Sequence, residues 1–214
     1  MLSLGMDIGT STVKLVLLKN QEIEKQWMAV HHGNPFVCLK KGLSALELDA
    51  DTPFSLCVTG SNTEALLEQA PDIPSFGDIP AVVEGVRQIV PQAGSVIEIG
   101  SQGARFITDL QSRAPQFAVN EHCAGGTGSF FEDQMSRVGC RLGDYSSLVE
   151  QAQSVPRLSG RCAVFAKTDI IHRQQEGVST PDILLGLCYA MIRNYKATIV
   201  RRFRSANRWY SAAA

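Results

Sequence analysis

The sequence predicts an α/β fold built from a duplicated unit, with two subdomains at residues 1–90 and 91–214. A strand–turn–strand pattern near the N-terminus recurs in the second half of the chain. Segments with helical periodicity lie between and after the apolar strands, which is typical of α/β chains. By length alone, the 214 residues could form one large domain or two small ones, and either could bury a substantial core.

The first half is predicted to contain a strand–turn–strand at 4–18, a helix over part of 34–48, a buried strand at 54–60 and a second helix at 79–90. Two apolar, β-prone runs flank the polar turn Gly9-Thr10-Ser11-Thr12. Valines and isoleucines recur at 3.6-type spacing in the second helix, which ends before Pro91.

The second half is predicted to begin with strands and to continue as helices, at 95–110, 116–120, 129–138, 145–153, 162–176 and 181–203. The last helix opens with Thr180-Pro181-Asp182, which supplies a cap, a proline in the first turn and an acid near the positive end of the helix dipole. The ending 201–214 carries no clear stop signal and is interpreted as a frayed end or an artificial boundary of the chain.

Composition and charge narrow the class of protein. The net charge is −1, so electrostatics give no general reason to expect nucleic acid or an anionic membrane as a partner. No apolar run approaches the ~18 to 20 residues of a membrane helix, and no secretion signal precedes the first strand. We therefore expect a cytoplasmic protein.

Six cysteines are spread along the chain without a CxxC pair, which argues against a zinc ribbon or a dense disulfide framework. In a reducing cytosol we interpret four of them, Cys38, Cys57, Cys140 and Cys188, as small buried hydrophobic residues. Cys123 and Cys162 differ, because glycines follow the first and a predicted helix follows the second.

The two strand–turn–strand patterns match residue by residue. Asp7-Ile8-Gly9-Thr10 aligns with Glu98-Ile99-Gly100-Ser101, and Lys14 aligns with Arg105, 91 residues later in each case. Glycine lets a backbone approach an anion closely, successive turn amides bind anions, and an acid can hold Mg²⁺ through water. The pattern indicates a two-part phosphate clamp; two ordinary β-turns with capping hydroxyls are the alternative.

This arrangement resembles the acetate and sugar kinase, heat-shock chaperone and actin superfamily. The resemblance implies a duplicated ribonuclease-H-like, actin-like ATPase fold, in which two subdomains close on ATP and each contributes one phosphate hairpin. "DIGTST" is similar to the first phosphate motif of that superfamily, and "EIGSQG" to the second.

Cys123 and Cys162 are candidate metal ligands. Each lies near a predicted helix start, where the helix dipole favours a thiolate. Two thiolates are too few for a complete four-thiolate cluster site, but a symmetric dimer supplies four. The alternative is that both are buried structural cysteines.

Four motifs occur in the order of one family: "DIGTST", "IEIGSQG", "CAGGTGSFFE" and "CAVFAKTDII…EG". Residues 3–200 resemble the activator ATPases of 2-hydroxyacyl-CoA dehydratases and the ATPase subunits of benzoyl-CoA reductases, the BadF/BadG/BcrA/BcrD type. The resemblance implies ATP/ADP, Mg²⁺ and one [4Fe–4S] cluster held by a homodimer through Cys123 and Cys162. It also implies an electron donor such as ferredoxin or flavodoxin, and a partner dehydratase or reductase that receives a low-potential electron.

The same resemblance assigns site residues. The first phosphate motif matches Asp7, Gly9, Thr10, Ser11, Thr12 and Lys14, and the second matches Gly100, Ser101 and Gln102. The glycine-rich nucleotide loop matches Gly125, Gly126, Thr127 and Gly128, and Glu132 matches the acid that closes that motif. Asp7 and Gln102 are the predicted catalytic residues.

The chain departs from the family pattern in two places. Gly103-Ala104-Arg105 stands where the family carries an aspartate followed by a serine–lysine pair, which predicts slow or lost hydrolysis. Nothing after Thr198 resembles the family's adenosine motif, so we expect a part of a longer activase. Two alternatives stay open: a kinase-like or nucleotide-binding module without a cluster, and a degenerate structural repeat.

Overall fold

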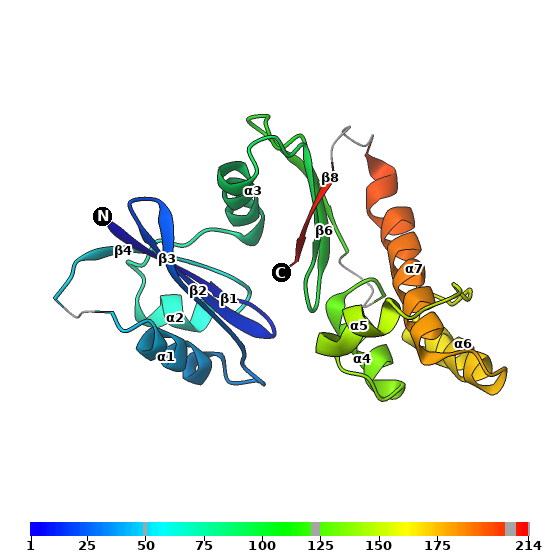
Figure 1. Cartoon of the computed structure of the whole chain (residues 1–214). Coiled ribbons are helices and arrows are strands. Elements are labelled where there is room, and N and C mark those ends of the chain that lie inside the picture. Colours follow the sequence, from blue (N-terminus) through cyan, green and yellow to red (C-terminus); the bar gives the residue numbers. More distant parts are fainter. Residues whose placement is uncertain (49–50, 121–124, 204–208, 214) are drawn as a thin grey trace. The chain divides into compact units, whose positions relative to one another are not determined.

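A computed structural model describes residues 1–48, 51–120, 125–203 and 209–213. Two compact units make up the chain, Met1–Ile89 and Val90–Ala214 (Figure 1). Within the described residues, no helix combines the length and the apolar character needed to cross a bilayer.

The first unit is a four-stranded sheet with helices. Its elements are β1 (Leu2–Ile8), β2 (Thr12–Lys19), β3 (Glu22–Val30), α1 (Pro35–Ala45), β4 (Phe54–Thr59), α2 (Glu64–Gln69) and α3 (Asp78–Ile89). The strand order is β3-β2-β1-β4; β1, β2 and β3 pair antiparallel, and β4 pairs parallel to β1.

Alternation along β2 creates the core face of this sheet. Val13, Leu15 and Leu17 are buried, because successive side chains of a strand point to opposite faces. Helix α1 packs on β2 and β3 (Figure 1) and adds Cys38 and Leu39 to the same core.

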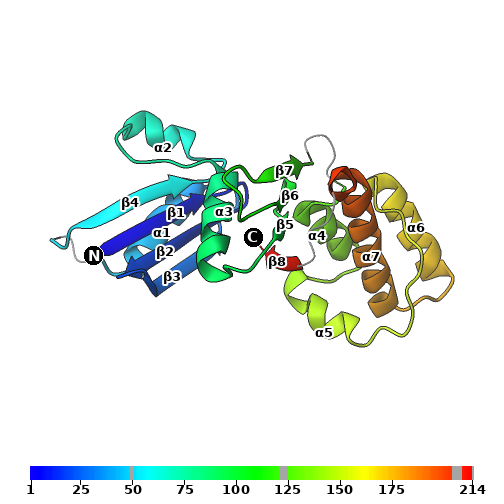
Figure 2. The same cartoon turned by 90° about the horizontal axis from the view of Figure 1, so that it is seen from above.

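The second unit joins a sheet to a group of helices (Figure 2). Its elements are β5 (Ser95–Ile99), β6 (Ala104–Thr108), β7 (Gln116–Val119), α4 (Gly128–Arg137), η1 (Leu142–Asp144), α5 (Tyr145–Val149), α6 (Ala163–Gln175), α7 (Thr180–Thr198), η2 (Val200–Arg202) and β8 (Trp209–Ala213). One core lies among α4, α5, α6 and α7, and the end of α7 forms a second core with the sheet through Tyr195 and Ile199.

The two sheets share one topology. The second has the order β7-β6-β5-β8, with β5, β6 and β7 antiparallel and β8 parallel to β5. Each strand therefore has a counterpart in the order β3-β2-β1-β4. The predicted duplicated α/β fold is confirmed.

Several element predictions need correction. Strands β3 and β8 and helix α2 were not predicted, and the helices expected at 145–153 and 181–203 end at Val149 and Thr198. The chain end is not a frayed helix over its described part, because η2 and β8 follow α7. Strand β3 lies at the edge of the sheet, and its first half, residues 22–26, is mostly charged or polar, so it lacks the continuous apolar signal of β1 and β2.

Candidate functional site

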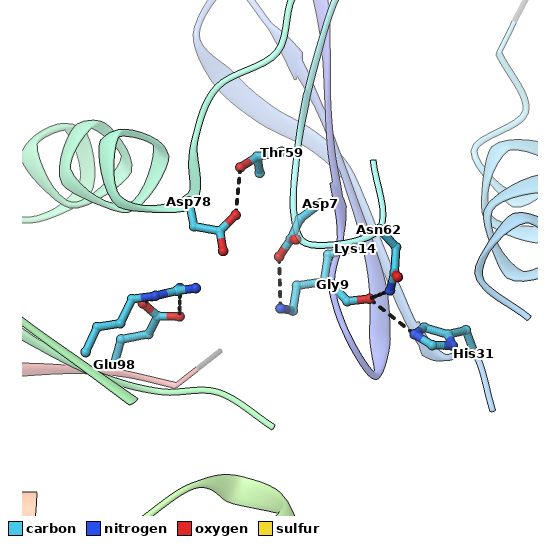
Figure 3. A network of polar contacts seen from close by, with 9 residues as sticks. Asp7, Gly9, Lys14, His31, Thr59, Asn62, Asp78 and Glu98 are labelled. Atoms are coloured by element: carbon cyan, nitrogen blue, oxygen red, sulfur yellow. Dashed lines mark hydrogen bonds and ion pairs between the residues drawn. The ribbon is translucent and has the colours of Figure 1, made fainter. Parts of the chain in front are cut away.

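The β1–β2 hairpin carries the first acid–base pair. Asp7 and Lys14 are cross-strand partners, and Lys14 Nζ donates to Asp7 Oδ2 at 3.1 Å (Figure 3). The Asp7 side chain keeps 35% of its surface exposed, so its carboxylate remains accessible to water. This geometry is that of an acid held in place at a strand end while still open to a hydrated cation.

The turn of this hairpin is fixed by contacts to Gly9. Its N–H donates to Thr12 O at 2.9 Å, while its carbonyl accepts from Asn62 Nδ2 at 2.7 Å and from His31 Nε2 at 3.2 Å (Figure 3). His31 Nδ1 also accepts from the Gly33 N–H, at 3.1 Å. Because the Gly9 carbonyl only accepts and the Gly33 amide only donates, the ring hydrogen lies on Nε2. Sequence reasoning missed both Asn62 and this use of His31.

A second carboxylate of the first unit lies beside Asp7. Thr59 at the end of β4 is the parallel register partner of Asp7, and its hydroxyl is 3.4 Å from Asp78 Oδ1 (Figure 3). Asp78 lies in the first turn of α3, where a carboxylate complements the helix dipole. Sequence reasoning did not select Asp78, since only the pairing of β4 with β1 brings it near the first phosphate motif.

The β5–β6 hairpin carries the equivalent pair in the second unit, with a different environment. Arg105 Nη1 donates to both oxygens of Glu98, at 2.7 and 2.9 Å, and Glu98 is 8% exposed (Figure 3). The turn closes through Gly100 N–H to Gly103 O at 2.8 Å, as at Gly9. The Glu98 carboxylate is therefore neutralised and buried, unlike that of Asp7.

Two backbone hydrogen bonds join this hairpin to the start of α4. The N–H groups of Gly128 and Ser129 donate to the carbonyls of Gly100 and Ser101, at 2.8 and 3.0 Å. Thr127 caps the helix, since its hydroxyl accepts from Phe130 N–H at 3.4 Å. The Gly128 amide, predicted to face a nucleotide, is thus bonded to the hairpin.

Gly125 brings the two cysteine motifs together. A Cβ placed on Gly125 would lie 2.5 Å from the carbonyl oxygen of Arg161, so the two backbones are in close contact and only glycine fits. Gly125 follows Cys123 by two residues and Arg161 directly precedes Cys162. Cys123 itself lies outside the described residues, but the described segments next to both cysteines are neighbours within one chain.

Cys162 begins α6. It is a half-buried, free thiol at the N-cap of that helix and makes no side-chain capping bond. It borders a cavity of about 520 Å³ whose other lining residues include Phe165 and three arginines, Arg157, Arg161 and Arg193. Among the described residues, no three His, Cys, Asp or Glu side chains come together as a metal site.

The other predicted residues occupy the two hairpins and α4. Thr10 and Gln102 are exposed at the turns, whereas Ser11, Thr12, Gly100 and Ser101 are half-buried. Thr127 is fully buried and Gly126 has a φ of +96°, while Glu132 is exposed on α4. Of the four cysteines expected to be buried, Cys38 is buried, and Cys57, Cys140 and Cys188 are half-buried.

Two sheets of the same order, each with an acid–glycine hairpin, define an actin-like ATPase fold. The chain belongs to the BadF/BadG/BcrA/BcrD ATPase family, whose model matches residues 4–207.

Several curated relatives are named as activators of CoA-ester dehydratases. The activator of lactoyl-CoA dehydratase of Anaerotignum propionicum is 29% identical over 192 residues, covering 87% of this chain and 73% of the relative. The 2-hydroxyisocaproyl-CoA dehydratase activator of Clostridioides difficile is 25% identical over 206 residues, covering 94% and 76%. A solved activator of 2-hydroxyisocaproyl-CoA dehydratase from Clostridium difficile, with bound ADPNP, matches 100% of this chain and 80% of its own at a TM-score of 0.87 and 24% identity, which supports the fold.

Proposed function

We propose that this protein is a cytoplasmic, ATP-dependent activator that passes a low-potential electron to a CoA-ester dehydratase or reductase. Homodimerisation, an iron–sulfur cluster and an electron donor of the ferredoxin or flavodoxin kind are parts of the proposal. The contact between Gly125 and Arg161 carries it, because that contact makes neighbours of the segments that bear Cys123 and Cys162.

The chain's own residues supply the nucleotide chemistry. Asp7 would hold Mg²⁺ through water, since its carboxylate is partly exposed and oriented by Lys14. The hydroxyls and amides of Thr10, Ser11 and Thr12 would bind phosphate oxygens at the turn. Asn62 and His31 would hold the Gly9 carbonyl and so keep the turn in one conformation.

Cluster binding would use Cys162 and Cys123 of each of two chains. The donor set fits, because thiolates are the ligands of a [4Fe–4S] cluster and each chain offers two of the four required. Such a cluster supplies one-electron chemistry at low potential. Within each chain, α6 would orient Cys162 at its N-cap, and the Gly125–Arg161 contact would fix the spacing of the two segments.

A second candidate is a nucleotide-binding module that hydrolyses ATP slowly or not at all. The observation that favours it is the Glu98–Arg105 pair: both carboxylate oxygens bind one guanidinium, so Glu98 is a poor ligand for a cation. Gly103 adds no acid next to it. In this case the protein would respond to nucleotide binding without turnover.

Anaerobic purification followed by iron and sulfide analysis tests the cluster. We expect about four irons and four sulfides per dimer, the content of one cuboidal cluster. Cys162→Ser is expected to lose most of this iron, and Cys57→Ser, a half-buried cysteine of the first unit, is the matched control that retains it. A colourless wild-type protein, or equal iron in both variants, would contradict the proposed ligand set.

Calorimetric titration with a non-hydrolysable ATP analogue and Mg²⁺ tests the nucleotide site separately. We expect binding in wild type and weaker binding in Asp7→Asn. If binding occurs without measurable phosphate release from ATP, the second candidate stands and the activator cycle does not. If no binding occurs, both functions fail and the degenerate repeat remains.

A further inference from the structure

Three consecutive side chains of α7 contact three segments of the proposed site. Arg193 Nη2 donates to Leu158 O at 3.2 Å, Asn194 Nδ2 donates to Gly125 O at 2.9 Å, and the Tyr195 hydroxyl donates to Arg105 O. We propose that this 193–195 segment couples the β5–β6 phosphate hairpin to the two cysteine-bearing segments. The inference rests on the proposed function for its nucleotide signal, and it adds residues to which no role was assigned above.

Helix geometry explains how three consecutive residues of α7 can contact three different segments. Successive side chains on an α-helix are about 100° apart, so neighbours in sequence point to different surroundings. Tyr195 points to the sheet core and is 4% exposed, Asn194 is 6% exposed, and Arg193 is at the surface. A displacement of the α7 backbone would therefore change the geometry of all three hydrogen bonds at once.

Tyr195 links α7 to the β5–β6 hairpin. It bonds to the carbonyl of Arg105, whose guanidinium holds Glu98 across the same hairpin. Burial, and then the nearby negative charge of Glu98, raises the pKa of Tyr195 well above its ordinary value. The hydroxyl therefore keeps its proton and remains a donor throughout the working pH range.

Asn194 links α7 to the segment that follows Cys123. The carbonyl of Gly125 accepts from both Asn194 Nδ2 and Asn120 Nδ2, the latter at 3.1 Å. The backbone N–H of Asn120 donates to Ala104 O on β6, at 2.9 Å. The Gly125 carbonyl, two residues after Cys123, is therefore bonded to α7 through Asn194 and linked to strand β6 through Asn120.

The segment before Cys162 is fixed to the same helix. Arg193 holds the carbonyl of Leu158, and a Cβ on Gly160 would lie 2.1 Å from the carbonyl oxygen of Ala190 on α7, so this backbone lies directly on the helix. Because Gly160 touches the α7 backbone directly, a displacement of the helix at Ala190 must also displace this segment. Both cysteine-bearing segments therefore follow the position of the last turns of α7.

Hydrogen–deuterium exchange on the full chain tests the coupling, with and without a non-hydrolysable ATP analogue. The readout is the ratio of amide exchange rates, without over with the analogue, in residues 125–129 and 157–162. In wild type we expect the analogue to change exchange in both segments. In Tyr195→Phe and Asn194→Ala this ratio is expected to lie closer to one than in wild type, by a factor of up to about five. That factor is the change in an equilibrium constant that the loss of one hydrogen bond produces.

The variants separate coupling from a purely structural role. Tyr195→Phe keeps the ring in the core and removes only the hydroxyl, so analogue affinity by calorimetry should equal that of wild type. Ile192→Ala, at a side chain of α7 that is 51% exposed, is the matched control and should keep the wild-type ratio. A variant that loses analogue affinity counts against the inference, because neither side chain is proposed to touch nucleotide.

Failure of the inference and failure of the proposed function give different results. A wild-type protein without iron removes the electron-transfer function, yet exchange still tests the coupling, because only bound nucleotide is needed. Wild-type ratios in both variants, or a wild-type protein in which the analogue alters neither segment, would overturn the coupling role of the 193–195 segment.

Discussion

Gly125→Ala is expected to separate the two cysteine-bearing segments. The added Cβ would lie 2.5 Å from Arg161 O and 3.1 Å from Gly160 O. Contacts under 3.0 Å are not sustained, so the Arg161 backbone must retreat by at least about 0.5 Å. Neither contact atom is the flexible end of a side chain, so overpacking should cost about 1–3 kcal/mol of unfolding free energy.

The assay combines urea denaturation with iron analysis of anaerobically purified protein. Gly125→Ala should lower the unfolding free energy of the second unit and reduce bound iron. Gly85→Ala is the matched control: nothing lies within 4 Å of its Cβ, and alanine within α3 should stabilise by up to about 1 kcal/mol. Wild-type stability together with wild-type iron in Gly125→Ala would refute the close contact as the basis of the site.

Three further predictions concern turnover, pH and the first turn. A Cβ at Gly103 meets nothing within 4 Å, so Gly103→Asp has room for its side chain. If the hairpin lacks an acid that positions water, this change should raise ATP turnover by about a hundredfold. Unchanged turnover at saturating ATP would contradict that explanation. Hydrogen bonds donated by the backbone N–H groups of Ser154 and then Gln153 lower the pKa of Asp182 below its usual 3.8. The carboxylate therefore stabilises the fold above that pH, and this stabilisation is lost as the pH falls through the lowered pKa. Acid titration followed by circular dichroism should detect the loss in wild type and not in Asp182→Asn. Asn62→Ala should weaken binding of the ATP analogue about fivefold, measured by calorimetry, and equal affinity would exclude the Gly9 contact as a determinant.

Local pattern explains what the sequence could predict. In the β1–β2 hairpin, period-2 alternation and a glycine turn define both strands, and the same residues recur at the β5–β6 hairpin. Acid and base at equal spacing from the turn are therefore cross-strand partners, Asp7 with Lys14 and Glu98 with Arg105. The length of the turn fixes the register of a hairpin, so both pairs can be inferred from the sequence alone.

Long-range pairing explains what the sequence could not predict. Strand β8 exists through its parallel pairing with β5, more than a hundred residues earlier, and its own residues give no strong strand signal. Asn194 meets Gly125 across 69 residues, and Tyr195 meets Arg105 across 90. Both residues lie on the buried side of α7, where periodicity indicates a core position and nothing indicates a hydrogen-bond partner.

Native mass spectrometry under anaerobic conditions is the most direct test of whether two chains share one cluster. We predict a dimer that carries a single added mass of four irons and four sulfides, and Cys162→Ser dimers or monomers without it. A monomer that carries iron on its own, or a dimer of unmodified mass, would contradict a shared cluster held by Cys123 and Cys162.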